Sequence, residues 1–215
     1  MNENIFTYKP KEEFFHTLSH GLGLFLAITG GIFLLFFTIQ SGKILNISGS
    51  IIYIIPLILL YTSSTFYHGS KNPSIKKKFK LFDHLAIYLF ICGTYAPFCF
   101  TLFPRPQGII IFSIVMTSSV LGTIYELFFI GKSKIISSII YVVTGIPAIF
   151  IIKSIWTLSS AQLFSCIILG GIAYVIGVIF YVSKKIPYNH VIWHIFVLIG
   201  SVFHFVAVFL QLGME

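Results

Sequence analysis

Apolar residues in this chain form long uninterrupted runs, separated by short segments that carry most of the charged side chains. Each run is close to the roughly 20 residues that a helix needs to cross a hydrocarbon core about 30 Å thick. The runs lack the alternation of a barrel strand, so helices would satisfy the backbone in lipid. The pattern predicts seven membrane-spanning helices, at Leu18–Ile39, Ile47–Tyr67, Leu81–Phe103, Gly108–Ile130, Ile135–Ile152, Gln162–Val182 and His190–Leu212.

Composition supports this interpretation. Hydrophobic residues make up 57% of the chain and charged residues 9%, and the mean hydropathy is +0.97, whereas a soluble domain carries roughly 25% charged residues. The net charge is +8, but the basic residues lie between apolar runs rather than on one face, which excludes nucleic-acid binding. We therefore predict an all-α integral membrane protein, a single seven-helix domain over residues 1–215 that crosses the cell membrane several times.

Basic residues are distributed unequally between alternate loops. One side holds Lys43, Arg105 and Lys153. The other side holds Lys9, Lys11, Lys71, Lys76, Lys77, Lys78, Lys80, Lys132, Lys134, Lys184 and Lys185. Because Lys-rich and Arg-rich loops stay in the cytoplasm, we predict a cytoplasmic N-terminus and, after seven crossings, an outside C-terminus.

Few ionisable residues fall within the predicted spans or at their ends, where such groups are costly and mark functional sites. They are His16, His20, His68, Asp83, His84, Glu126, His190, His194 and His204. Six of the seven histidines and Asp83 fall at the predicted cytoplasmic ends of their spans. This sorting by depth predicts one site in the cytoplasmic third of the bundle.

The spacing of His190 and His194 places two imidazoles on one helix face, about 6 Å apart along the axis. With His68 at matching depth, they form a plausible three-histidine Zn²⁺ site, whose Zn–N bonds would be about 2.0–2.1 Å. No H-E-x-x-H motif supplies a general base, so Asp83 is the best placed carboxylate to take a proton or orient water. Ser64, one turn deeper than His68, could hydrogen-bond into the site.

The other ionisable residues leave alternatives open. His16 and His20 have the same spacing and form a rival metal pair, or His20 supports the site by hydrogen bonding. His84 points about 100° away from Asp83, so we do not expect both to face one site. We expect Glu126 to pair with a loop lysine or a backbone group. His204, about 21 Å deeper than His190, is expected to hydrogen-bond across helices or to line a cavity, and we favour the hydrogen bond.

Taken together, these motifs resemble the hemolysin III branch of the progestin and adipoQ receptor family, and the wider superfamily that contains alkaline ceramidases. The resemblance rests on Ser63–His68, on Phe82-Asp83-His84 followed by Gly93–Pro97, on His190-x-x-x-His194, and on Leu18–Gly23. It implies a seven-helix bundle with an inside N-terminus and a Zn²⁺ ion held by His68, His190 and His194. It also implies that Asp83 reaches the zinc through a water and that Ser64 is the serine one turn before the first histidine.

Three functions are compatible with such a site. The first is a zinc hydrolase acting on a lipid amide or ester, with Asp83 taking the proton from water. The second is a signalling or stress-response protein in which zinc only holds helices together. The third is a cytolysin, as the family name suggests, although a repeated charged stripe typical of a pore is missing. A retinal protein is excluded because His190–Leu212 contains no lysine for a Schiff base.

Overall fold

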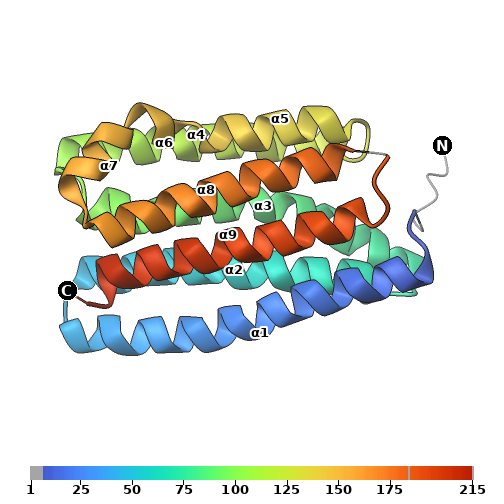
Figure 1. Ribbon diagram of the computed structural model, residues 1–215, viewed down its shortest axis with the longest axis horizontal. Coiled ribbons are helices and arrows are strands. Elements are labelled where there is room, and N and C mark those ends of the chain that lie inside the picture. Colours follow the sequence, from blue (N-terminus) through green and yellow to red (C-terminus); the bar gives the residue numbers. More distant parts are fainter. Residues whose placement is uncertain (1–6, 184, 215) are drawn as a thin grey trace.

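The computed structural model describes residues 7–183 and 185–214, and the regular secondary structure in these residues is helical. The helices lie side by side along the long axis of the molecule, and α1 begins at the end opposite to the one where α9 finishes (Figure 1). Their bounds are α1 (Pro10–Ser41), α2 (Ile44–Gly69), α3 (Pro73–Thr101), α4 (Arg105–Phe129), α5 (Lys134–Gly145), α6 (Pro147–Phe150), α7 (Ile152–Leu158), α8 (Ala161–Val182) and α9 (Asn189–Leu212).

The helical prediction is confirmed, with six to seven candidate spans. Six helices, α1 to α4, α8 and α9, are each long and apolar enough to cross a membrane. A seventh crossing exists if α5, α6 and α7 form one span, which is bent by 53° after α6. Helices that are neighbours along the chain pack together: α2 packs against both α1 and α3, and α8 packs against α9. In addition, α9 contacts α1, so the first and last helices of the chain meet in the bundle.

The predicted fifth span is not one straight helix. Pro147 has no backbone N–H and its ring crowds the preceding turn, so α5 ends at Gly145 and α6 starts anew. Tyr95 bridges the break, since its hydroxyl donates to the Gly145 carbonyl at 2.6 Å and accepts from the Ala148 N–H at 2.9 Å. In an apolar surrounding, these two bonds satisfy backbone groups that would otherwise be unpaired.

The predicted inner loop around Lys71–Lys80 is mostly helix. Asn72 caps α3 by accepting from the backbone N–H groups of Ser74 and Ile75, and Pro73 takes the first helical position, where its missing N–H is harmless. The first helix likewise starts at Pro10, well before the predicted Leu18. Lys184, counted in an inner loop, lies outside the described residues.

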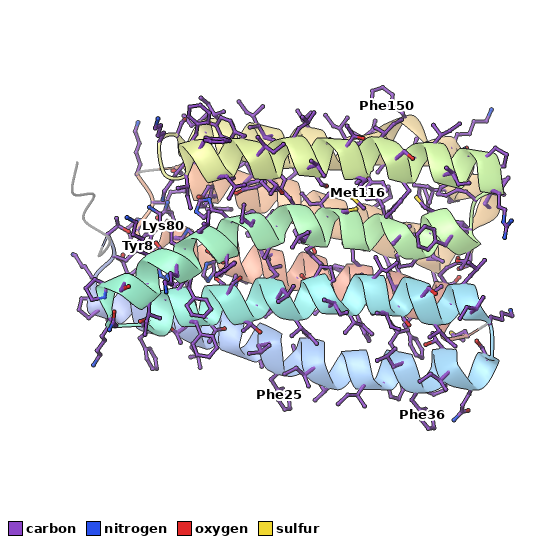
Figure 2. The ribbon with its side chains drawn as sticks, turned by 180° about the vertical axis from the view of Figure 1, so that it is seen from behind. Tyr8, Phe25, Phe36, Lys80, Met116 and Phe150 are labelled. Carbon is purple, nitrogen blue, oxygen red and sulfur yellow. The ribbon has the colours of Figure 1, made fainter. Side chains whose placement is uncertain are left out.

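Large apolar side chains cover the outside of the bundle. Phe25, Phe36 and Phe150 point away from the helices (Figure 2) and are 57–83% exposed. Such a surface is stable in lipid, where apolar groups need no burial in protein. The interior holds a separate set of apolar residues that includes Leu34, Leu57 and Val208.

Candidate metal centre

Three imidazoles converge at the end of the bundle where α1, α3 and α9 begin. His68 comes from the end of α2, and His190 and His194 come from the first two turns of α9. One ring nitrogen from each lies within 4.8 Å of the others, and all three side chains are buried. The Nε2 atoms of His190 and His194 are 3.2 Å apart. This cluster can hold a metal ion.

The hydrogen bonds of these rings fit metal binding. His68 uses Nδ1 to bond the Glu13 carboxylate at 2.6 Å, while its Nε2 is buried with no hydrogen-bond partner among the described residues. His194 similarly has Nδ1 3.3 Å from the Ser19 hydroxyl, which leaves Nε2 toward the cluster. Metal-binding histidines typically bond one nitrogen to a carboxylate or another polar group and present the other to the ion. An orphaned, buried ring nitrogen is costly, and a cation would satisfy it.

Glu13 is a residue of the site that sequence reasoning missed. Its carboxylate lies 2.8 Å from the Lys76 ammonium and 3.6 Å from His16 Nδ1, in addition to its bond with His68. Lys76 is only 1% exposed and also donates to the Tyr67 carbonyl at 2.9 Å. Lys76, counted among the loop lysines, is therefore part of the core of the site.

Glu13, His16 and His68 also form a group with metal-ligand spacing. The ammonium of Lys76 already lies against this carboxylate, and two cations so close together repel each other strongly in a buried site. We therefore interpret Glu13 and Lys76 as the support of His68 rather than as a second metal centre.

The rival pair His16 and His20 lies around the triad instead of forming its own site. The His20 ring stacks on His194 with ring centroids 3.6 Å apart. The His16 ring lies 4.4 Å from that of His68 and 4.8 Å from that of His190. His16 is 1% exposed and lies within the helix cluster.

Tyr8 closes the outer side of the cluster. Its ring stacks on His190 at 5.0 Å and meets His16 edge-on at 4.7 Å. Burial and the nearby Glu13 carboxylate both raise the pKa of the Tyr8 hydroxyl, so it stays protonated at neutral pH. Tyr8, which precedes α1, and Lys80, which lies on α3, are close to the same end of the bundle (Figure 2).

The two predicted catalytic residues face a cavity next to the triad. Asp83 and Ser64 line a cavity of about 900 Å³ whose wall also includes His190 and His194. The Ser64 hydroxyl is buried and has no hydrogen-bond partner among the described residues. The structure thus gathers the predicted site residues at one end of the molecule, although the roles of Asp83 and Ser64 stay predictions.

The favoured expectations for two of the remaining residues are wrong, whereas the alternative that His204 lines a cavity is confirmed. Within residues 7–183 and 185–214, Glu126 pairs with a histidine and a tyrosine instead of a lysine or a backbone group, because its carboxylate lies 3.4 Å from His84 Nδ1 and accepts from the Tyr141 hydroxyl at 3.2 Å. His204 bonds the Gly200 carbonyl of its own helix instead of another helix, and its ring lines the cavity. Buried polar groups require hydrogen-bond partners. Other helices supply the partners of Glu126, and the preceding turn of α9 supplies the partner of His204.

Known proteins resemble this chain over most of its length. The family of haemolysin-III related proteins matches residues 8–205. The Hemolysin-3 homolog of Bacillus subtilis (strain 168) is 36% identical over 198 residues, which cover 92% of this chain and 93% of that protein. Hemolysin-3 of Bacillus cereus is 35% identical over 198 residues, 92% of this chain and 90% of that protein.

A human protein is also similar. The monocyte to macrophage differentiation factor of Homo sapiens is 30% identical over 165 residues, 73% of this chain and 67% of that protein. The family match includes all three histidines of the triad, Asp83 and Ser64. The resemblance seen in the sequence motifs is therefore confirmed, and the chain is a multi-pass membrane protein that belongs to the haemolysin-III related family.

Proposed function

We propose that this protein is a zinc-dependent hydrolase of a lipid amide or ester, with its site near the cytoplasmic face of the membrane. The proposal rests on one observation: a large cavity lies beside the buried triad of His68, His190 and His194. The carboxylate-bearing residue Asp83 lines the same cavity. A metal that only held helices together would not need such a cavity beside it. Cavities of about 300–1,000 Å³ are typical of small-molecule sites.

The cavity has the shape and lining that an acyl chain requires. It extends from Asp83 and His190 at one end of the bundle to Phe103 and Ile155 toward the other, and most of its wall is apolar. Ile149 of α6 and Val175 of α8 line it and are 63% and 52% exposed. A lipid from the bilayer would enter between these helices.

The chain's own residues divide the remaining tasks. The triad would hold the ion, and the chemistry that Zn²⁺ supplies at such a site is Lewis acidity, which polarises a carbonyl and lowers the pKa of a water. Asp83 takes the proton from the attacking water and returns it to the leaving group. Ser64, whose hydroxyl is otherwise unpaired, donates a hydrogen bond to the substrate or to Asp83. The apolar wall binds the chain and excludes bulk water.

Membrane lysis is a second candidate, because two of the relatives carry the name Hemolysin-3 or Hemolysin-3 homolog. Lipid hydrolysis would account for lysis without a pore, since it releases detergent-like products. A signalling protein with structural zinc is the non-enzymatic alternative.

Purified protein incubated with a panel of ceramides and acyl lipids tests the proposal. We expect release of fatty acid by the wild type. In Asp83→Asn we expect a rate about 10²–10⁴-fold lower, the usual effect of removing a general base, at unchanged metal content. Wild-type protein that is folded and zinc-loaded but hydrolyses no lipid in the panel would favour the non-enzymatic alternative.

A further inference from the structure

His204 is a buried polar residue that the metal centre does not use. It lies on α9, ten residues after His194 and therefore about 15 Å along the helix axis. It is only 8% exposed, and its ring lines the same cavity as the triad. The cavity wall between His194 and His204 includes Val197 of the same helix, so a chain that follows α9 from the triad passes an apolar side chain before it reaches His204.

The His204 ring is held in one orientation. Nδ1–H donates to the Gly200 carbonyl at 3.0 Å, and the ring stacks on Tyr174 with centroids 5.3 Å apart. A carbonyl oxygen accepts only, so Nδ1 carries the proton and Nε2 is a hydrogen-bond acceptor. Gly170 leaves the space for this ring, because a Cβ atom there would lie 2.3 Å from His204 Nδ1.

We propose that His204 is a specificity residue, whose Nε2 accepts a hydrogen bond from a hydroxyl group in the middle of a bound acyl chain. This inference rests on the proposed function, which assigns the cavity to an acyl lipid. Each residue of an extended peptide contributes three backbone bonds and spans about 3.3–3.6 Å. By the same geometry, an extended acyl chain advances about 1.2 Å per bond. The 15 Å along α9 therefore correspond to a hydroxyl on about the twelfth carbon from the reacting carbonyl.

His204 Nε2 is a hydrogen-bond acceptor in a cavity whose wall is mostly apolar. An unsubstituted chain that fills the cavity covers the ring nitrogen of His204 without forming a hydrogen bond to it, and removing this nitrogen from water costs free energy. A hydroxyl group at the depth of His204 replaces the missing hydrogen bond. A hydroxyl group beside Val197 meets an apolar wall and is itself left without a hydrogen-bond partner. The site therefore selects both the presence and the position of the group.

Competitive binding of free fatty acids to the full-length, purified protein tests this inference without requiring turnover. We expect 12-hydroxystearic acid to bind about two- to tenfold more tightly than stearic acid, the usual worth of one hydrogen bond. We expect 6-hydroxystearic acid to gain nothing. In His204→Phe, which keeps an aromatic ring, the preference for the 12-hydroxyl disappears while stearic acid still binds.

Two further variants keep the test decisive if His204→Phe fails to fold. Gly170→Ala displaces the His204 ring and should also lower the preference. Thr94→Val is the matched control, because Thr94 lines the cavity but donates its hydroxyl to the Phe90 carbonyl of its own helix, and it should retain the preference.

Equal binding of stearic and 12-hydroxystearic acids by the wild type would overturn the inference and leave His204 as a ligand of internal water only. A preference that persists in both His204→Phe and Gly170→Ala would overturn it as well. Failure of the hydrolase proposal is distinguishable, since it would leave the binding preference intact while no lipid is cleaved.

Discussion

At the scale of single residues, the Glu13 carboxylate connects three helices through one side chain. It lies on α1, bonds His68 at the end of α2 and pairs with Lys76 at the start of α3. Lys76 is 1% exposed, and a buried charge that loses its partner typically costs about 3–5 kcal/mol. Glu13 therefore fixes the ring of His68 and compensates a buried ammonium at the same time.

We expect Glu13→Gln to lower metal affinity about 10–100-fold, the usual effect of losing a residue that orients a metal-binding histidine. The amide is neutral, so it holds His68 Nδ1–H less strongly and removes the negative charge that lies 2.8 Å from the Lys76 ammonium. Titration of purified protein with a metal chelator measures the effect. Glu12→Gln is the matched control, because the Glu12 carboxylate accepts from the backbone N–H of Lys9 at the exposed start of α1. Equal affinity in the two variants would contradict this role of Glu13.

The triad could be predicted from the sequence, because the position of each histidine within its predicted span and the i, i+4 spacing of His190 and His194 can be determined from the sequence. It could not reach Glu13, Lys76 or Tyr8, because their contacts with His68 and His190 depend on how α1, α2, α3 and α9 meet. A lysine in a run of lysines is typical of a cytoplasmic loop, and nothing in the sequence distinguishes Lys76 from Lys77 and Lys78. Burial of one of them depends on the tertiary structure.

At the scale of secondary-structure elements, the break between α5 and α6 shapes the cavity. Tyr95 of α3 holds both sides of the break with one hydroxyl, and Tyr95, Gly145 and Ala148 all line the cavity. The sequence Gly145-Ile146-Pro147 already contained the signal, because a proline disfavours helix in the residue before it. Its apolar surroundings made the segment resemble a continuous span.

Tyr95→Phe should destabilise the protein, because the Gly145 carbonyl and the Ala148 N–H then lose their partner in an apolar surrounding. Leaving one such group unpaired costs about 1–3 kcal/mol. Thermal unfolding in detergent, followed by circular dichroism, measures the loss. Tyr125→Phe serves as the control, since no hydrogen bond of comparable placement involves its hydroxyl among the described residues. A Tm of Tyr95→Phe equal to that of the control would refute the bridging role.

At the scale of the whole molecule, the start of α1 and the end of α9 lie at opposite ends of the bundle (Figure 1), as expected if α5, α6 and α7 together form a seventh span. Most basic residues, the histidine triad and Asp83 lie toward the end where α1 starts. Orientation by the positive-inside rule would put that end in the cytoplasm, and hydropathy predicted the helices because lipid admits few other structures. The series of apolar runs predicts where the helices are, but it does not determine which helices pack against one another.

Labelling of single cysteines in a cysteine-free background tests the orientation. We expect Lys77→Cys to react with a membrane-impermeant thiol reagent only after the cells are opened, and Gly213→Cys to react on intact cells. The reason is the excess of lysine on the side that carries Lys77. Labelling of Lys77→Cys on intact cells would place the histidine triad at the outer face instead.

The central claim is that His68, His190 and His194 hold one zinc ion, and metal analysis of purified protein tests it most directly. We predict about one zinc per chain in the wild type, as in other three-histidine sites. The zinc should be lost in His68→Ala and in the double variant His190→Ala, His194→Ala, and retained in His204→Ala, whose ring lies about 15 Å away along α9. A full zinc content in the double variant would contradict the account.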